Sequence, residues 1–132
     1  MRERLFRGKR VDNGEWIQGY ICRYGWIGKE KNYIIPDYAS ALYTIEIDPE
    51  TVGQYTGLTD KNGRKIFEGD IIENIVTGKK GVIQWFDEYS AFMIWSRTKN
   101  AIYFLYDNAF SRIHIVGNAF DNPELLKTDK EK

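Results

Sequence analysis

A tight-turn motif near the middle of the chain, Asp60-Lys61-Asn62-Gly63, restricts the fold more than any other stretch. An Asp at the first position of a turn can accept hydrogen bonds from nearby backbone N–H groups, and a Gly at the last position adopts a left-handed conformation without steric cost. Asn62-Gly63 is also the pair that two-residue hairpin loops favour, because both central residues then need positive φ. Either turn folds Tyr55–Leu58 back against Lys65–Phe67, so we expect a central β-hairpin.

The segments before this hairpin have the alternation and the turn residues of short strands. Leu5–Val11 and Glu15–Tyr24 flank a second turn motif, Asp12-Asn13-Gly14, and predict an N-terminal hairpin. Tyr33–Pro36 and Leu42–Ile47 follow as two further strands. The chain then breaks at Asp48-Pro49, because Pro fixes φ and the residue before it avoids the helical region.

After the central hairpin, strands follow one another closely. Gly69 lets the chain bend, and Asp70 begins the next strand. Tight turns separate five candidate strands: Asp70–Val76, Lys80–Phe86, Ala91–Arg97, Ala101–Tyr106 and Arg112–Val116. Five short strands at this spacing predict a small, strongly bent barrel of the Src-homology or Tudor kind. Asn122-Pro123-Glu124 predicts a short helix over Pro123–Lys127, with Asn122 as its N-cap.

Some of these strands are apolar on both faces. Lys80–Phe86 places Val82 and Phe86 opposite Ile83 and Trp85, whereas a sheet with one face in water would alternate. Such strands need a second layer, which the N-terminal half or another subunit would supply. We therefore expect one all-β domain over residues 1–132, with N-terminal strands (1–53) and the hairpin (54–69) packed on a five-stranded barrel (70–126), closed by a short helix and followed by a frayed tail (127–132).

Composition supports β structure and excludes several classes of protein. Aromatic residues make up 15% of the chain, and such residues favour pleated, half-buried surfaces. The formal net charge is zero, so no global attraction draws the chain to nucleic acid or an anionic membrane. Cys22 is the only cysteine, which excludes an internal disulfide. The longest apolar run, Ala101–Tyr106, is too short to span a bilayer, and we expect a cytoplasmic protein with no membrane contact.

Several ordered motifs resemble those of one known family. Gln54–Leu58, Asp60–Gly63 and Ile66–Ile71 together resemble the signature of the YopX family. Asp48–Gly53, just before the signature, and Ile115–Asn118, near the close, match as well. The resemblance implies a small protein encoded by a phage or prophage of a Gram-positive bacterium, acting in the cytoplasm of the host cell. It carries over no catalytic motif, cofactor or established activity.

Few residues suggest catalytic or metal chemistry. His114 is the only histidine, and no neighbouring Ser or Cys offers a nucleophile for it. One His and one Cys do not make a conventional zinc site. Glu68 and Asp70 flank Gly69, and an extended backbone would place both carboxylates on one side, where they could bind a hard cation or act as acid and base. The favoured interpretation is structural, with Asp70 accepting hydrogen bonds from backbone amides of the adjacent bend. We assign no catalytic, metal or cofactor residue.

Two features suggest binding. Lys61, Arg64 and Lys65 on the hairpin, with Lys79-Lys80 on a later turn, could form a basic surface near Tyr55 and Trp85. Single-strand binders use this mixture, with cations for phosphates and rings for stacking. Trp26 lies in a loop rich in glycine and charge, Gly25–Asn32, where it could anchor a partner. We expect it to pack into the core instead.

The favoured hypothesis is a non-enzymatic phage accessory protein that binds an unknown protein partner and forms a homo-oligomer. The alternative is a nucleic-acid-binding small barrel, and a metal-dependent enzyme built on Glu68 and Asp70 ranks third. The candidate interaction surface consists of Tyr55, Lys61, Arg64, Lys65, Glu68, Asp70 and Trp85.

Overall fold

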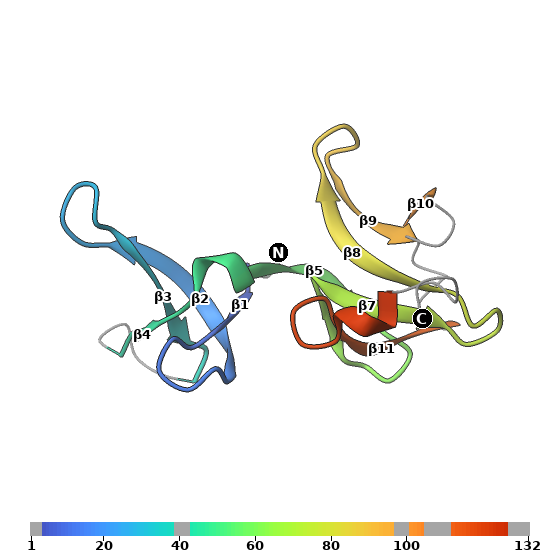
Figure 1. Cartoon of the computed structure of the whole chain (residues 1–132), viewed down its shortest axis with the longest axis horizontal. Helices are drawn as coiled ribbons and strands as arrows, with labels where there is room; N and C mark the ends of the chain where they lie inside the picture. Colours follow the sequence, from blue (N-terminus) through green and yellow to red (C-terminus); the bar gives the residue numbers. More distant parts are fainter. Residues whose placement is uncertain (1–3, 39–42, 97–100, 105–111, 127–132) are drawn as a thin grey trace. The chain divides into compact units, whose positions relative to one another are not determined.

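The computed structural model describes residues 4–38, 43–96, 101–104 and 112–126. Regular structure in these ranges is almost entirely strand, arranged as two antiparallel sheets (Figure 1). The predicted all-β class is confirmed. Contacts group the chain into two compact units, Met1–Tyr55 and Thr56–Lys132. The division falls inside strand β5 (Gly53–Thr59).

The first unit contains a sheet of four strands ahead of β5. These are β1 (Phe6–Lys9), β2 (Trp16–Tyr24), β3 (Lys31–Pro36) and β4 (Ile45–Glu46). Each pairs antiparallel with the next, and β1 also pairs with the start of β5. The predicted N-terminal hairpin is confirmed, because β1 and β2 pair antiparallel and Gly14 adopts φ +72° in the turn between them.

The core of the first unit is aliphatic. Leu5, Ile34 and Ile47 are almost completely buried. The predicted break after β4 is a 3-10 turn, η1 (Pro49–Thr51). Asp48 caps this turn, since its side chain accepts a hydrogen bond from the backbone N–H of Glu50 at 3.0 Å. The start predicted for β4, Leu42, lies outside the described residues.

The central hairpin of the second unit joins the later part of β5 to β6 (Lys65–Phe67). The N–H of Gly63 donates to the carbonyl of Asp60 at 3.0 Å, and the N–H of Asp60 donates to the carbonyl of Arg64 at 2.9 Å. Gly63 adopts φ +80°, whereas Asn62 is not among the described residues with positive φ. The turn with Asp first and Gly last is therefore correct, and the two-residue Asn-Gly turn is wrong.

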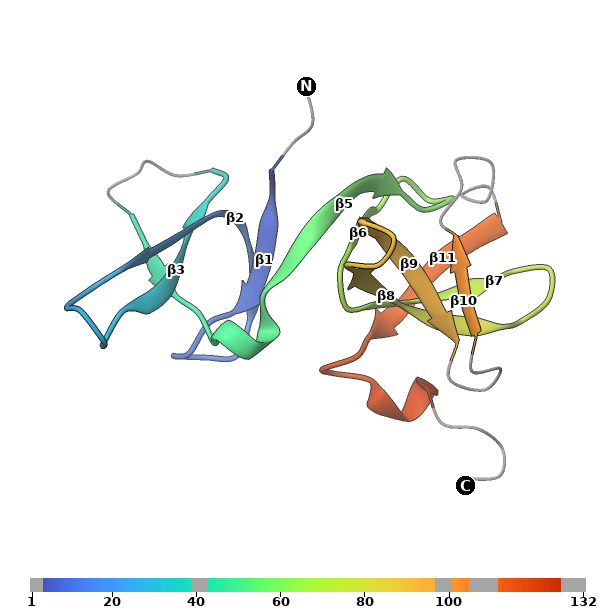
Figure 2. The ribbon, with the colours of Figure 1, turned by 90° about the horizontal axis from the view of Figure 1, so that it is seen from above.

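The second unit contains the five later strands as predicted, with slightly shifted ends. They are β7 (Asp70–Asn74), β8 (Lys80–Phe86), β9 (Ala91–Ser96), β10 (Ala101–Phe104) and β11 (Ile113–Asn118). Their order in the sheet is β10-β9-β8-β7-β11, and Figure 2 shows β8, β9 and β10 next to one another. The prediction of a closed barrel is wrong, because β10 and β11 occupy opposite edges and do not pair within the described residues. Closure depends on long-range register, which short strands and tight turns do not determine.

The core of the second unit lies against one face of this sheet. It is a cluster of five isoleucines with Phe92 and Ile94 packed against it: Ile66, Ile72, Ile83, Ile113 and Ile115. On the other face Ile71, Val82 and Met93 are also buried. Burial on both faces of β7 and β8 therefore agrees with the apolar pattern of the sequence, although Trp85, near the end of β8, is 43% exposed.

The described chain ends with a second 3-10 turn, η3 (Pro123–Leu126). The short helix predicted after Asn122 is thus present as a tighter turn. The side-chain oxygen of Asn122 accepts a hydrogen bond from the backbone N–H of Asn118 at 3.2 Å, which closes the loop before η3. The predicted helix end at Lys127 and the predicted tail, 127–132, lie outside the described residues.

Candidate interaction surface

Asp60 attaches the central hairpin to the second sheet. One carboxylate oxygen accepts hydrogen bonds from the backbone N–H groups of Asn62 and Arg64, both at 2.9 Å. The other oxygen accepts from the backbone N–H of Ile115 in β11 at 3.0 Å. Burial acts to raise the pKa of Asp60, but these three donors outweigh it and the pKa lies below its usual value. The hairpin packs on the C-terminal sheet as predicted.

The predicted basic and aromatic residues are only partly available for binding. Lys61, Arg64 and Lys65 are exposed. Tyr55 is buried, with 7% of its surface exposed, so its ring is not available for stacking. The indole N–H of Trp85 donates to Asp87 at 2.6 Å, and the ring meets Phe92 edge-on with centroids 5.1 Å apart. The interleaved surface described for single-strand binders therefore lacks one of its two rings.

Glu68 and Asp70 do not form the extended pair that the sequence allowed. The backbone turns at Gly69, with φ +92°. Asp70 is buried, and its carboxylate accepts a hydrogen bond from the backbone N–H of Phe67 at 2.7 Å. This geometry agrees with the structural role favoured for Asp70. Within the described residues, no three His, Cys, Asp or Glu side chains group as metal ligands would.

His114 takes part in a network that bridges three strands. It lies opposite Glu73 in the β7–β11 pairing, and its Nε2 is 3.0 Å from the Glu73 carboxylate. Lys80 of β8 lies 3.1 Å from the other oxygen of that carboxylate. Hydrogen bonds from His114 and then Lys80 hold the pKa of Glu73 below its usual value. The single histidine thus has a structural partner.

The turn between β2 and β3 exposes two large apolar side chains. Trp26 is 84% exposed and Ile27 is 99% exposed. The prediction that Trp26 packs into the core is wrong. The turn is nevertheless ordered by hydrogen bonds, since the N–H of Lys29 donates to the carbonyl of Trp26 at 2.8 Å and the N–H of Gly28 donates to Glu30 at 3.1 Å. Figure 1 shows this turn at the end of the long β2–β3 hairpin.

Tyrosines also lie on the two strands of this hairpin. Tyr20 and Tyr24 lie on the same face of β2, and each is about half exposed. Tyr24 stacks on Tyr33 of β3, with ring centroids 4.2 Å apart, and its hydroxyl lies 3.0 Å from that of Thr44. These contacts fix the ring while leaving its outer face open. We call Tyr20, Tyr24, Trp26, Ile27 and Tyr33 the aromatic ribbon.

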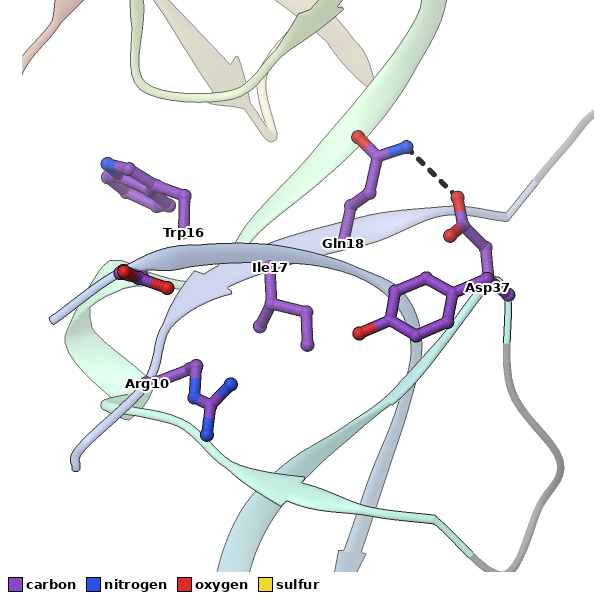
Figure 3. A pocket seen from close by; sticks show the side chains of 7 residues that line it. Arg10, Trp16, Ile17, Gln18 and Asp37 are labelled. Carbon is purple, nitrogen blue, oxygen red and sulfur yellow. Dashed lines mark hydrogen bonds between the residues drawn. The ribbon is translucent and has the colours of Figure 1, made fainter. Parts of the chain in front are cut away.

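A shallow hollow of about 350 Å³ lies beside the other end of β2. Figure 3 shows Ile17 between Arg10 on one side and Asp37 on the other. Arg10 is already held by both carboxylate oxygens of Asp12, at 2.9 and 2.7 Å. The amide of Gln18 donates to Asp37 at 3.0 Å. Because Arg10, Gln18 and Asp37 already have partners within the fold, the hollow offers few polar groups that could bind a small ligand.

The tyrosines of β2 were the feature that sequence reasoning missed, whereas Trp26 was named as a possible anchor and then wrongly placed in the core. A detectable signal existed in the alternation of Tyr20 and Tyr24 with Ile21. It would have marked one face of β2 as aromatic. The sequence pattern does not determine whether another segment of the chain covers that face.

Fold and surface together define a small all-β protein with two antiparallel sheets and an exposed aromatic hairpin. The chain belongs to the YopX protein family, whose match covers residues 5–127. It is also similar in fold to the crystal structure of protein EF1440 from Enterococcus faecalis, with a TM-score of 0.57 and 23% identity over 96% of this chain and 100% of the other. No curated protein matches the sequence. No helix in the described ranges is long and apolar enough to cross a membrane.

Proposed function

We propose that this protein is a non-enzymatic interaction module that binds a partner protein through the aromatic ribbon. The observation that supports the proposal is the exposure of Trp26 and Ile27 side by side on an ordered turn. Single exposed apolar residues are common on protein surfaces, but adjacent exposed aromatic and aliphatic groups are typical of contact sites. Trp and Tyr are also the residue types enriched among those that dominate binding energy.

The energetics favour binding by this turn. Covering an exposed side chain as large as Trp or Ile contributes roughly 1.5–3 kcal/mol. The turn is already closed by the Lys29–Trp26 hydrogen bond, and Tyr24 is held by Tyr33. A surface ordered before binding loses less conformational entropy when the partner arrives. The ribbon therefore combines apolar area with preorganisation.

The proposal extends to the biological setting. The family resemblance supports a phage- or prophage-encoded accessory protein acting in the host cytoplasm. A non-enzymatic role is supported by the structural use of the groups that could carry chemistry, since Asp60 and Asp70 accept backbone N–H groups and His114 pairs with Glu73. The alternative, binding of nucleic acid, is weakened because the ring of Tyr55 is buried. Lys61, Arg64 and Lys65 are nevertheless exposed.

Replacing Trp26 and Ile27 together with Ser is expected to weaken partner binding at least tenfold, since about 1.4 kcal/mol corresponds to a factor of ten. The measurement is recovery of partners from phage-infected host lysate by tagged protein after nuclease treatment, followed by titration of the recovered partner. Val76→Ser is the matched control, because Val76 is 74% exposed in the second unit. Equal loss in both variants, or undiminished binding by the double variant, contradicts the assignment to the ribbon.

We also expect the protein to form a homo-oligomer in solution. Exposed apolar groups on both units, such as Ile27 and Ile75, favour self-association. Size-exclusion chromatography with light scattering over a range of concentrations measures the mass directly. A mass of one chain at every concentration would refute this part of the proposal and leave the partner-binding part standing.

A further inference from the structure

Three basic residues from separate parts of the sequence gather at one end of the second sheet. Lys61 lies in the hairpin turn, and its backbone N–H donates to the carbonyl of Ile113 at 3.0 Å. Ile113 pairs with Asn74 across β11 and β7. The N–H of Asn74 donates to the carbonyl of Lys79 at 2.9 Å, and Arg112 directly precedes Ile113. We call Lys61, Lys79 and Arg112 the basic end.

The charge of the basic end is not neutralised within the described part of the chain. All three residues are exposed, and none forms an ion pair with a described residue. The nearest carboxylate in the strand pairing, Glu73, is already shared by Lys80 and His114. The basic end therefore presents three positive charges on a protein whose formal net charge is zero.

Three exposed acidic residues of the second unit lie at the opposite end of its strands. Asp87 and Glu88 follow the last residue of β8, which begins at Lys80. Asp121 follows the last residue of β11, which begins at Ile113. Because β8 and β11 both run from the basic end to this acidic end, these three carboxylates lie away from the basic end, where the carboxylates of Asp60 and Glu73 already have partners within the fold.

We propose that the basic end binds the phosphate backbone of a nucleic acid. Cations that meet phosphates release condensed counterions, which supplies affinity without any reading of sequence. The exposed aromatic rings described in the second unit, Trp85, Tyr89 and Phe120, lie on segments at the acidic end. The contact is therefore made by charge to phosphate, without stacking on bases, and it extends the function beyond the protein contacts of the aromatic ribbon.

The experiment measures fluorescence anisotropy of a labelled single strand of about 20 nucleotides, and of the matching duplex, over a range of salt concentrations. The test variant is Lys61→Gln, Lys79→Gln and Arg112→Gln combined. The control variant is Arg23→Gln, Lys29→Gln and Lys31→Gln combined, which removes the same charge from exposed positions of the first unit. Circular dichroism confirms that both variants fold.

We expect the wild-type protein and the control to bind at low salt, and the test variant to bind at least tenfold more weakly. Since each neutralised phosphate contributes about −0.9 to the slope of log affinity against log salt, the slope of the test variant should be shallower by about 2 to 3. Binding of either the single-stranded or the duplex probe supports the proposal. Absence of binding at low salt, equal loss in the control, or equally tight binding of polyglutamate would overturn it.

Discussion

Replacing Asp60 with Ala is expected to destabilise the second unit by about 2 kcal/mol or more, because the buried N–H of Ile115 loses its acceptor, at a cost of about 1–3 kcal/mol, and two partly buried N–H groups each lose a hydrogen bond worth about 0.5–1.5 kcal/mol. The three donors are those of Asn62, Arg64 and Ile115. Urea unfolding followed by tryptophan fluorescence measures the free energy of unfolding. The loss should exceed that of any exposed turn substitution, since Asp60 is only 4% exposed.

Two further variants make the Asp60 experiment specific. Asp87→Ala removes an exposed turn aspartate and should change stability by less than about 0.5 kcal/mol. Asp60→Asn keeps one oxygen but presents an N–H₂ group to a backbone donor, so an intermediate loss is expected. Because the pKa of Asp60 is lowered in the folded state, its contribution is present above the ordinary pKa and disappears as the pH falls below it. Asp60→Asn should therefore reduce the fall in unfolding free energy that the wild-type protein shows as the pH is lowered. An unchanged fall would contradict the role assigned to the carboxylate.

Replacing Gly19 with Ala is expected to destabilise the first unit by about 3 kcal/mol, at the upper end of the cost of overpacking. An added Cβ would overlap the carbonyl oxygen of Ile35 and lie 2.8 Å from its carbonyl carbon and 2.9 Å from the Cα of Pro36. These are backbone atoms of β3, which cannot rotate away as a side chain can. Relief requires β2 and β3 to separate at Gly19, and hydrogen exchange should increase along both strands.

Gly14→Ala is the matched control for Gly19→Ala. Gly14 has open space around it, but its φ of +72° is unfavourable for a residue with a Cβ. That strain costs about 1–2 kcal/mol and should leave exchange along β2 and β3 unchanged. If the two variants lost the same stability with the same exchange pattern, close packing at Gly19 would not be the cause.

Local turn chemistry was the part of the fold that could be predicted. The turn beginning at Asp60, the turn at Gly14 and the bounds of β8 all follow from residues next to one another in sequence. Both turn glycines adopt positive φ, as a tight turn of this kind requires. The docking of Asp60 onto Ile115 could not be predicted, because the partner lies far along the chain and no local pattern specifies it.

Burial of aromatic residues was predicted poorly for the same physical reason. Trp26 was expected in the core and is exposed, whereas Tyr55 was expected on a surface and is buried. Both side chains have apolar rings, and their surroundings are set by which distant strand passes over them. Barrel closure was likewise beyond the local pattern, since it depends on the register between β10 and β11 rather than on their composition.

The hydrogen bond between Asp60 and Ile115 also constrains the order in which the second unit can fold during synthesis. It joins residues 55 positions apart, and Lys61 reaches Ile113 in the same region. A growing chain can close the hairpin turn as soon as Arg64 has emerged from the ribosome, but one oxygen of Asp60 must wait for β11. A nascent chain stopped before Ile113 would thus lack two of the five isoleucines of the core cluster, so Ile66, Ile72 and Ile83 could not complete their packing until β11 is made.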